Sequence, residues 1–115
     1  MTHKIFEMPV ADVYPHYVNK VVKKGRTEEE LIEVISWLTG FSSGSIKKHL
    51  SARTSFREFF DEAKLHSNAE LITGSICGVK IQEIEDPLMK KIRYLDKLVD
   101  ELAKGRPLEK ILRTS

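Results

Sequence analysis

The sequence is poor in the residues from which several kinds of scaffold and site are built. It has one cysteine among 115 residues, so neither an internal disulfide nor a cysteine-based zinc site can form within one chain. Such a chain suits a reducing cytoplasm, where we expect the protein. It also lacks an apolar run long enough to span a bilayer, so we expect no membrane partner. Residues 1–9 contain no apolar stretch of signal-peptide length.

Motifs that carry catalysis or hold a cofactor are missing as well. Residues 40–44 and 74–78 contain glycines, but neither stretch has the lysine of a P-loop or the spacing of a dinucleotide-binding turn. The four histidines include no pair at the i, i+4 spacing of helical metal ligands. We therefore expect no cofactor and no metal, and we favour a binding or regulatory module over an enzyme. The apolar neighbours of Cys77 predict a buried side chain and not a reactive thiol.

Size and patterning predict a single helical domain. With 115 residues, of which 41% are hydrophobic and 31% charged, the chain can build one core but not two. Apolar residues recur at spacings of three and four along most of it, as in amphipathic helices. We predict an all-α fold, a compact bundle of about five helices over residues 1–115, with 1–8 and 113–115 loosely ordered.

The first helix is predicted between Pro9 and Lys24, with a complication at Pro15. A proline inside a helix removes one backbone hydrogen bond and clashes with the preceding turn. We therefore interpret residues 10–14 as a separate short turn. Pro15 then becomes the first residue of the main helix, where its missing N–H costs nothing.

Capping residues mark the later helices. Helices are predicted at 28–39, 43–52, 56–63 and 87–104. The predicted caps are Thr27, Ser42 or Ser43, Thr54 or Ser55, and Asp86, respectively. The first of these has the form of a capping box, because Glu30 follows Thr27 by three residues. Gly40 is typical of a helix end.

Residues 71–84 fit two structures. Val79 and Ile81 alternate with polar residues as in a strand, and two glycines suit bends. The helical spacing of apolar residues nevertheless continues from Ile81 into the following helix. We favour a short helix that leads into the long one, and a short extended segment near residues 76–84 is the alternative.

Five segments together resemble a known family. They are Val13-Tyr14-Pro15, Trp37-Leu38-Thr39-Gly40, Phe56 to Ala63, Ile76-Cys77-Gly78-Val79 and Ile92 to Gly105. On these residues the chain resembles a bacterial domain-of-unknown-function family, number 2200 in that series, over nearly its whole length. The segment 92–105 is the most specific of the five. The family has no established activity, ligand or catalytic residue, so the resemblance implies a compact bacterial domain and no function.

The most specific functional hypothesis is a helix-turn-helix over residues 28–53. Such a unit joins two helices by a short turn and lays the second in the major groove of DNA. Here 28–39 would be the supporting helix, 40–42 the turn and 43–52 the recognition helix. From Ser42 to Arg57 the chain has four basic residues and no acidic one. We expect contacts to double-stranded DNA from Ser43, Ser45, Lys47, Lys48, Arg53 and Arg57.

The packing positions of such a unit are mostly filled by suitable residues. Apolar or small residues are needed at four positions, which hold Ile35, Ser36, Phe41 and Ile46. His49 stands where a further apolar residue is expected, and the first turn of the second helix has no Arg, Asn or Gln to read bases. The alternative is an ordinary helical hairpin with a solvated basic face.

The long helix suggests a different kind of partner. Its apolar residues follow nearly a heptad pattern: Leu88, Ile92, Leu95, Val99 and Leu102. This stripe either packs inside the monomer or forms an interface with a second copy or another protein. Two function classes therefore stay open: a nucleic-acid-binding module, and a protein-interaction or homodimerising domain that uses the amphipathic helix 87–104.

Overall fold

The fold is built almost entirely of helices. The computed structural model describes residues 4–76 and 78–112. Its α-helices are α1 (Val10–Val22), α2 (Glu28–Thr39), α3 (Ser43–Ser51), α4 (Phe56–Glu62), α5 (Pro87–Ala103) and α6 (Leu108–Ile111). The other described elements are the 3-10 helices η1 (Lys4–Glu7), η2 (Ser67–Leu71) and η3 (Ile81–Glu83), and the short strands β1 (Ser75–Ile76) and β2 (Val79–Lys80). The prediction of an all-α bundle of about five helices is confirmed, since five of the α-helices have at least seven residues.

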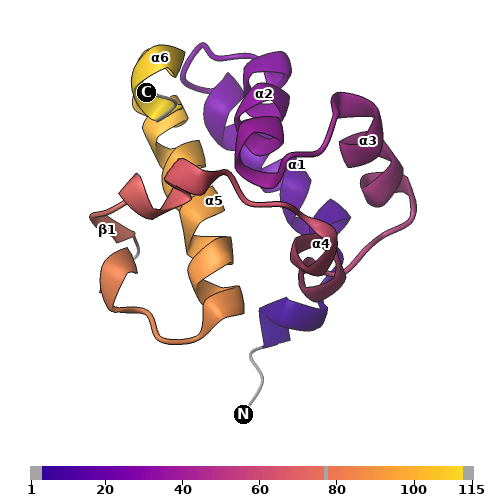
Figure 1. Ribbon diagram of the computed structural model, residues 1–115. Coiled ribbons are helices and arrows are strands. Elements are labelled where there is room, and N and C mark those ends of the chain that lie inside the picture. Colours follow the sequence, from indigo (N-terminus) through magenta and orange to yellow (C-terminus); the bar gives the residue numbers. More distant parts are fainter. Residues whose placement is uncertain (1–3, 77, 113–115) are drawn as a thin grey trace.

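Helix α5 is the centre of the bundle. It packs against α1, α2, α4, α6, β1 and η3, and Figure 1 shows it running along most of the molecule. A cluster of buried hydrophobic side chains joins these elements. Phe56, Phe59 and Phe60 on α4 are each at most 1% exposed, so all three face this core. Within the described residues, no helix is both long and apolar enough to cross a bilayer.

Side-chain caps fix where the helices begin, as predicted. Thr27 Oγ1 accepts a hydrogen bond from the Glu30 N–H (3.1 Å), and the Glu30 carboxylate accepts one from the Thr27 N–H (3.0 Å). Ser42, Ser55 and Asp86 cap α3, α4 and α5 by accepting from backbone N–H groups. Each cap satisfies donors that have no partner inside the helix and is worth about 1 kcal/mol.

The prediction that Pro15 begins the main helix is wrong. Helix α1 is continuous from Val10 to Val22 and contains Pro15 in its interior. Its first turn is held from outside, because the Val10 N–H donates to the Thr54 carbonyl (2.8 Å) and Val10 itself is 3% exposed. These tertiary contacts keep residues 10–14 helical although Pro15 supplies no N–H.

Residues 4–7, part of the segment that we expect to be loosely ordered, form η1 and contact α4. Phe6 in η1 is 2% exposed, and the guanidinium of Arg57 lies 5.4 Å from the centre of its ring. The Phe56 N–H donates to the Met8 carbonyl (3.0 Å), and Pro9 forms an isolated antiparallel bridge with Ser55. This segment is therefore packed against the start of α4. Residues 1–3 and 113–115 lie outside the described part of the chain.

We expect Pro15→Ala to raise the free energy of unfolding by about 2 kcal/mol. The side chain is exposed, so little packing is lost, and the new N–H can donate to the Ala11 carbonyl. Urea unfolding followed by circular dichroism measures the change. The matched control is Pro87→Ala, which alters a first-turn proline of α5 and should give no comparable gain. A fall in stability of the Pro15 variant would contradict this account of α1.

The extended alternative for residues 71–84 is confirmed at 75–76 and 79–80, and the favoured short helix is reduced to the three-residue 3-10 helix η3 before α5. Strands β1 and β2 pair antiparallel, with Ser75 opposite Lys80 and Ile76 opposite Val79, and η3 follows. The physical reason is that Gly74 (φ 104°) and Gly78 (φ 78°) both adopt left-handed conformations that would interrupt a helix. The predicted burial of Cys77 concerns a residue outside the described part of the chain.

The apolar stripe of α5 belongs to the core of the monomer. Ile92, Leu95, Val99 and Leu102 are each at most 1% exposed, and Leu88 is half-buried. These side chains pack against other elements of the same chain. Core packing therefore accounts for the heptad-like spacing, and the four buried residues present no surface to a second copy.

Polar contacts join α1 to α5 beside the apolar core. The Tyr17 hydroxyl donates to the Asp96 carboxylate (2.6 Å). One turn further along α5, Asp100 forms ion pairs with Lys20 (3.3 Å) and Lys104 (3.0 Å). Burial raises the pKa of Tyr17 well above its usual value of 10.0, and the charge of Asp96 raises it further. The phenol therefore stays protonated and keeps donating at neutral pH.

Candidate functional site

The hairpin of α2 and α3 is formed by a short, strongly determined turn. Gly40 ends α2 in the left-handed conformation (φ 77°), and its N–H donates to the Ser36 carbonyl (2.9 Å). The Ser36 hydroxyl donates to the Phe41 carbonyl (2.6 Å), and Ser42 caps α3 by accepting from the Ser45 N–H (3.2 Å). The helix–turn–helix order predicted for residues 28–53 is therefore present, with α3 ending one residue earlier than predicted.

The inner side of the hairpin is buried against the rest of the fold. Ile35 is 3% and Ile46 1% exposed, and α1 packs against both α2 and α3. His49 fills its position through aromatic contacts, with ring centres 4.8 Å from Phe41 and 5.4 Å from Phe59. An imidazole thus replaces the apolar side chain expected there.

The outer face of α3 is small, polar and basic. Its exposed residues, including the capping residue, are Ser42, Ser43, Gly44, Lys47, Lys48 and Ser51. Among the described residues, neither Lys47 nor Lys48 forms an ion pair. Helix α3 lies at one edge of the molecule (Figure 1), so this face is open to a partner.

The six side chains predicted to contact DNA are only partly brought together. Ser43, Lys47 and Lys48 are on the outer face of α3, whereas Ser45 is half-buried and helps to form the cap. Arg53 follows α3 in a left-handed conformation (φ 53°) and pairs with Asp12 (2.9 Å).

Arg57 is directed to a different neighbour. It lies on α4, where it pairs with Glu7 (2.8 Å) and covers the Phe6 ring. The two arginines are thus neutralised by acids from the N-terminal part of the chain. Two lysines are left to supply the unpaired positive charge of the predicted surface.

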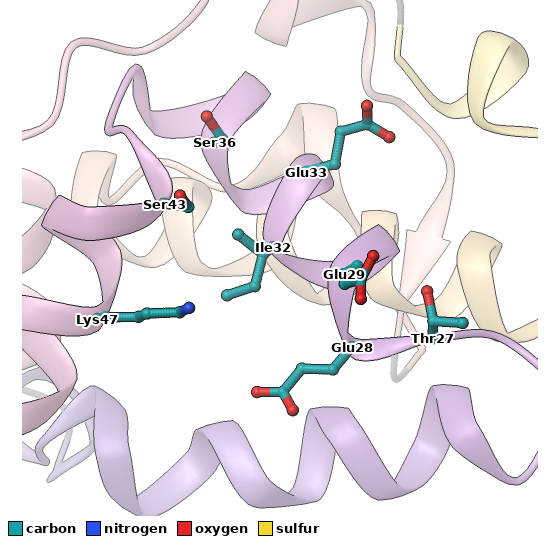
Figure 2. Close-up of a pocket in the computed structure, with 8 residues that line it drawn as sticks. All are labelled: Thr27, Glu28, Glu29, Ile32, Glu33, Ser36, Ser43 and Lys47. Atoms are coloured by element: carbon teal, nitrogen blue, oxygen red, sulfur yellow. The ribbon is translucent and has the colours of Figure 1, made fainter.

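A groove separates α2 from α3 and carries acidic residues that sequence reasoning missed. It has a volume of about 630 Å³ and is lined by Thr27, Glu28, Glu29, Ile32, Glu33, Ser36, Ser43 and Lys47. Figure 2 shows the Lys47 ammonium and the Glu28 carboxylate pointing into the same gap, with Ile32 between them. Nothing local in the sequence places these glutamates beside α3.

One of these glutamates is fixed by a hydrogen bond from α1. The Tyr14 hydroxyl donates to the Glu28 carboxylate (2.6 Å). Burial raises the pKa of Tyr14, and the bond and charge of Glu28 raise it further. Glu29 and Glu33 are exposed, and an anion approaching the α2 side of the groove meets their negative charge.

Among the described residues, no group of three or more His, Cys, Asp or Glu side chains is arranged to hold a metal ion. Of the described histidines, His49 and His66 are half-buried and His16 is exposed.

Comparison with known proteins gives a family and no activity. The profile of a family described as "Uncharacterized protein conserved in bacteria (DUF2200)" matches residues 4–113. No curated protein matches the chain. A solved structure entitled "Crystal structure of uncharacterized protein SP1917" is 42% identical, with a TM-score of 0.91. The similarity covers 97% of this chain and 93% of that one, so the two share the whole fold.

Proposed function

The chain belongs to the DUF2200 family of bacterial proteins, whose description assigns no activity, and we propose that it binds duplex DNA through α3. The observation that carries the proposal is the outer face of α3, which combines small polar residues with two unpaired lysines on a helix–turn–helix hairpin. In this arrangement α3 lies in the major groove and α2 supports it from behind.

The chemistry of the face suits phosphates better than base edges. Ser42, Ser43 and Gly44 are small, so the start of α3 can approach the duplex closely. Lys47 and Lys48 can each neutralise one phosphate. Serine hydroxyls contact more than one base type, and no Arg, Asn or Gln in the first turn of α3 offers bidentate recognition. The expected binding is therefore weakly selective for sequence.

Neighbouring charges set the strength of this binding. The Arg53–Asp12 pair is exposed, so it contributes at most about 1 kcal/mol and Arg53 can exchange Asp12 for a phosphate. Glu29 and Glu33 on the adjacent helix repel phosphates. We expect a modest affinity, with a slope of log affinity against log salt of about −2 to −3, because two or three phosphates are neutralised.

Fluorescence anisotropy of a labelled mixed-sequence duplex, titrated at two salt concentrations, tests the proposal. The wild type should bind in the micromolar range at low salt, and the double variant Lys47→Glu/Lys48→Glu should lose at least tenfold in affinity. The matched control is Lys23→Glu/Lys24→Glu, which changes the net charge equally at two exposed lysines after α1. Absence of wild-type binding at low salt, or an equal loss in the control, would refute the proposal.

A protein partner is the second candidate, and the α2–α3 groove favours it. Ile32 offers an apolar contact, and Glu28, Glu29 and Glu33 place three carboxylates around it. This combination is complementary to a segment with an apolar side chain flanked by lysines or arginines. If the duplex does not bind, a peptide of that composition should be titrated next, with Glu29→Lys/Glu33→Lys as the variant that removes binding.

A further inference from the structure

A second groove lies between the segment 65–70 and the first half of α5. It has a volume of about 330 Å³ and shares no lining residue with the α2–α3 groove. That volume is near the lower end of the range seen for small-molecule sites. Tyr94, Lys90 and Lys91 line it from α5, and His66, Ser67 and Glu70 line it from the opposite segment.

Tyr94 presents a polar group without a partner. The residue as a whole is 5% exposed, and its hydroxyl, which forms no hydrogen bond with any described residue, is not among the fully buried polar atoms and so is accessible to solvent. An accessible phenol hydroxyl without a protein partner, at the wall of a groove, can donate a hydrogen bond to a ligand or to water. Burial raises the pKa of Tyr94, and the charge of Glu70 raises it further, so the hydroxyl remains a donor.

His66 is held so that one ring nitrogen is left free. Its Nδ1 accepts a hydrogen bond from the Asn68 N–H (2.9 Å), and its ring stacks on Trp37 with centres 4.4 Å apart. The backbone N–H of His66 donates to the Leu38 carbonyl (3.1 Å). Because Nδ1 acts as the acceptor, the proton of the neutral ring is on Nε2, which is a second donor at the groove.

The charges around the groove favour an anion. Lys90 and Lys91 are half-buried and form no ion pair within the described residues. Partial burial strengthens the attraction of an ammonium group for a negative ligand. Glu70 is the acidic residue in the lining, and its carboxylate can accept from a hydroxyl or amine of the same ligand.

We propose that this groove binds a small organic anion through its phosphate or carboxylate group. Lys90 and Lys91 neutralise the negative charge, and the Tyr94 hydroxyl and His66 Nε2–H donate to its oxygens. Ser67 offers a further hydroxyl, and Glu70 orients a donor at the other end of the molecule. The assignment is independent of DNA binding, because no residue of α2 or α3 lines this groove.

Trp37 provides the readout for a test, because it is the single tryptophan of the chain and stacks on His66. Its fluorescence should change saturably when the wild type is titrated with inorganic phosphate or with citrate at constant ionic strength. Stronger binding of phosphate would identify a phosphate-bearing ligand, and stronger binding of citrate a carboxylate. A change equal to that with sodium chloride, without saturation, would overturn the proposal.

Two variants separate the site from the fold. Tyr94→Phe removes a hydroxyl without a protein partner, so the unfolding midpoint without anion should stay unchanged while anion binding weakens about fivefold. Lys90→Gln/Lys91→Gln should lose at least tenfold in affinity. The control, Lys23→Gln/Lys24→Gln, removes the same charge elsewhere and should bind as the wild type does. Unaltered affinity in both groove variants would also overturn the proposal.

Discussion

Leu95→Lys is expected to abolish the folded state. Leu95 is 1% exposed at the middle of the central helix, and the substitution removes its packing and places an ammonium group among apolar side chains. Loss of a buried leucine alone costs about 2–5 kcal/mol, and the unpaired charge adds to this. The sum approaches the whole stability of a typical domain, about 5–15 kcal/mol. Circular dichroism and a thermal melt should show a chain without a cooperative transition.

Leu88→Lys is the matched control for that variant. It makes the same chemical change on the same helix, but Leu88 is half-buried in the first turn of α5, where the longer side chain can reach water. This variant should fold and lose about 1 kcal/mol. A folded, monomeric Leu95→Lys variant would instead show that the stripe is an interface between chains.

Gly40→Ala is expected to destabilise the protein by about 2–4 kcal/mol. The left-handed conformation (φ 77°) costs any L-residue about 1–2 kcal/mol. The added Cβ would also lie 2.9 Å from the Lys64 carbonyl oxygen. That backbone cannot move away freely, because the Lys64 N–H donates to the Thr39 carbonyl (2.9 Å) at the end of α2.

Gly25→Ala separates the cost of the left-handed conformation from the cost of the contact with Lys64. Gly25 has nearly the same backbone conformation (φ 82°), but a Cβ there meets nothing within 4 Å. Gly25→Ala should therefore lower the free energy of unfolding by about 1 kcal/mol, which is the conformational cost alone. Urea unfolding measures the loss in the free energy of unfolding for each variant. The loss at Gly40 minus the loss at Gly25 is the cost of the contact with Lys64. Equal losses at the two glycines would show that the segment after α4 yields to the new methyl group.

Helix ends were predictable because their causes are local. The capping box of Thr27 and Glu30 spans four residues, and Asp86 with Pro87 begins α5 through groups adjacent in sequence. The hairpin turn at residues 40–42 was predictable for the same reason. Such signals need no knowledge of what packs against the helix.

The predictions for α1 and for residues 71–84 failed because a single-sequence pattern does not show what decides the local structure there. Helix α1 continues through Pro15 because its first turn is bonded to Thr54, which sequence patterning cannot show. The glycines at 74 and 78 were visible, but the apolar spacing that continued past Ile81 outweighed them in the prediction. A tertiary contact determines the start of α1, and left-handed glycines determine the strands near residues 75–80.

The candidate sites were predictable only in part, because many of their residues are far apart in the sequence. The small basic face of α3 lies on one helix, so its spacing revealed it. The ion pair that occupies Arg57 joins residues 50 positions apart. The anion groove pairs His66 with Tyr94 across two segments, and neither residue belongs to a motif. Charges and donors that meet only in three dimensions leave no pattern in a single sequence.

The pairing of α1 with α5 also determines the order in which the molecule can assemble. Tyr17 and Asp96 are separated by 79 positions, and Arg26 donates to the Arg106 carbonyl across 80. During synthesis the inward face of α1 leaves the ribosome long before its partner exists. Contacts this far apart slow folding, because a long loop must close before they form. Until α5 emerges, α1 can pack only against helices that are synthesised earlier than α5, chiefly α2 and α3.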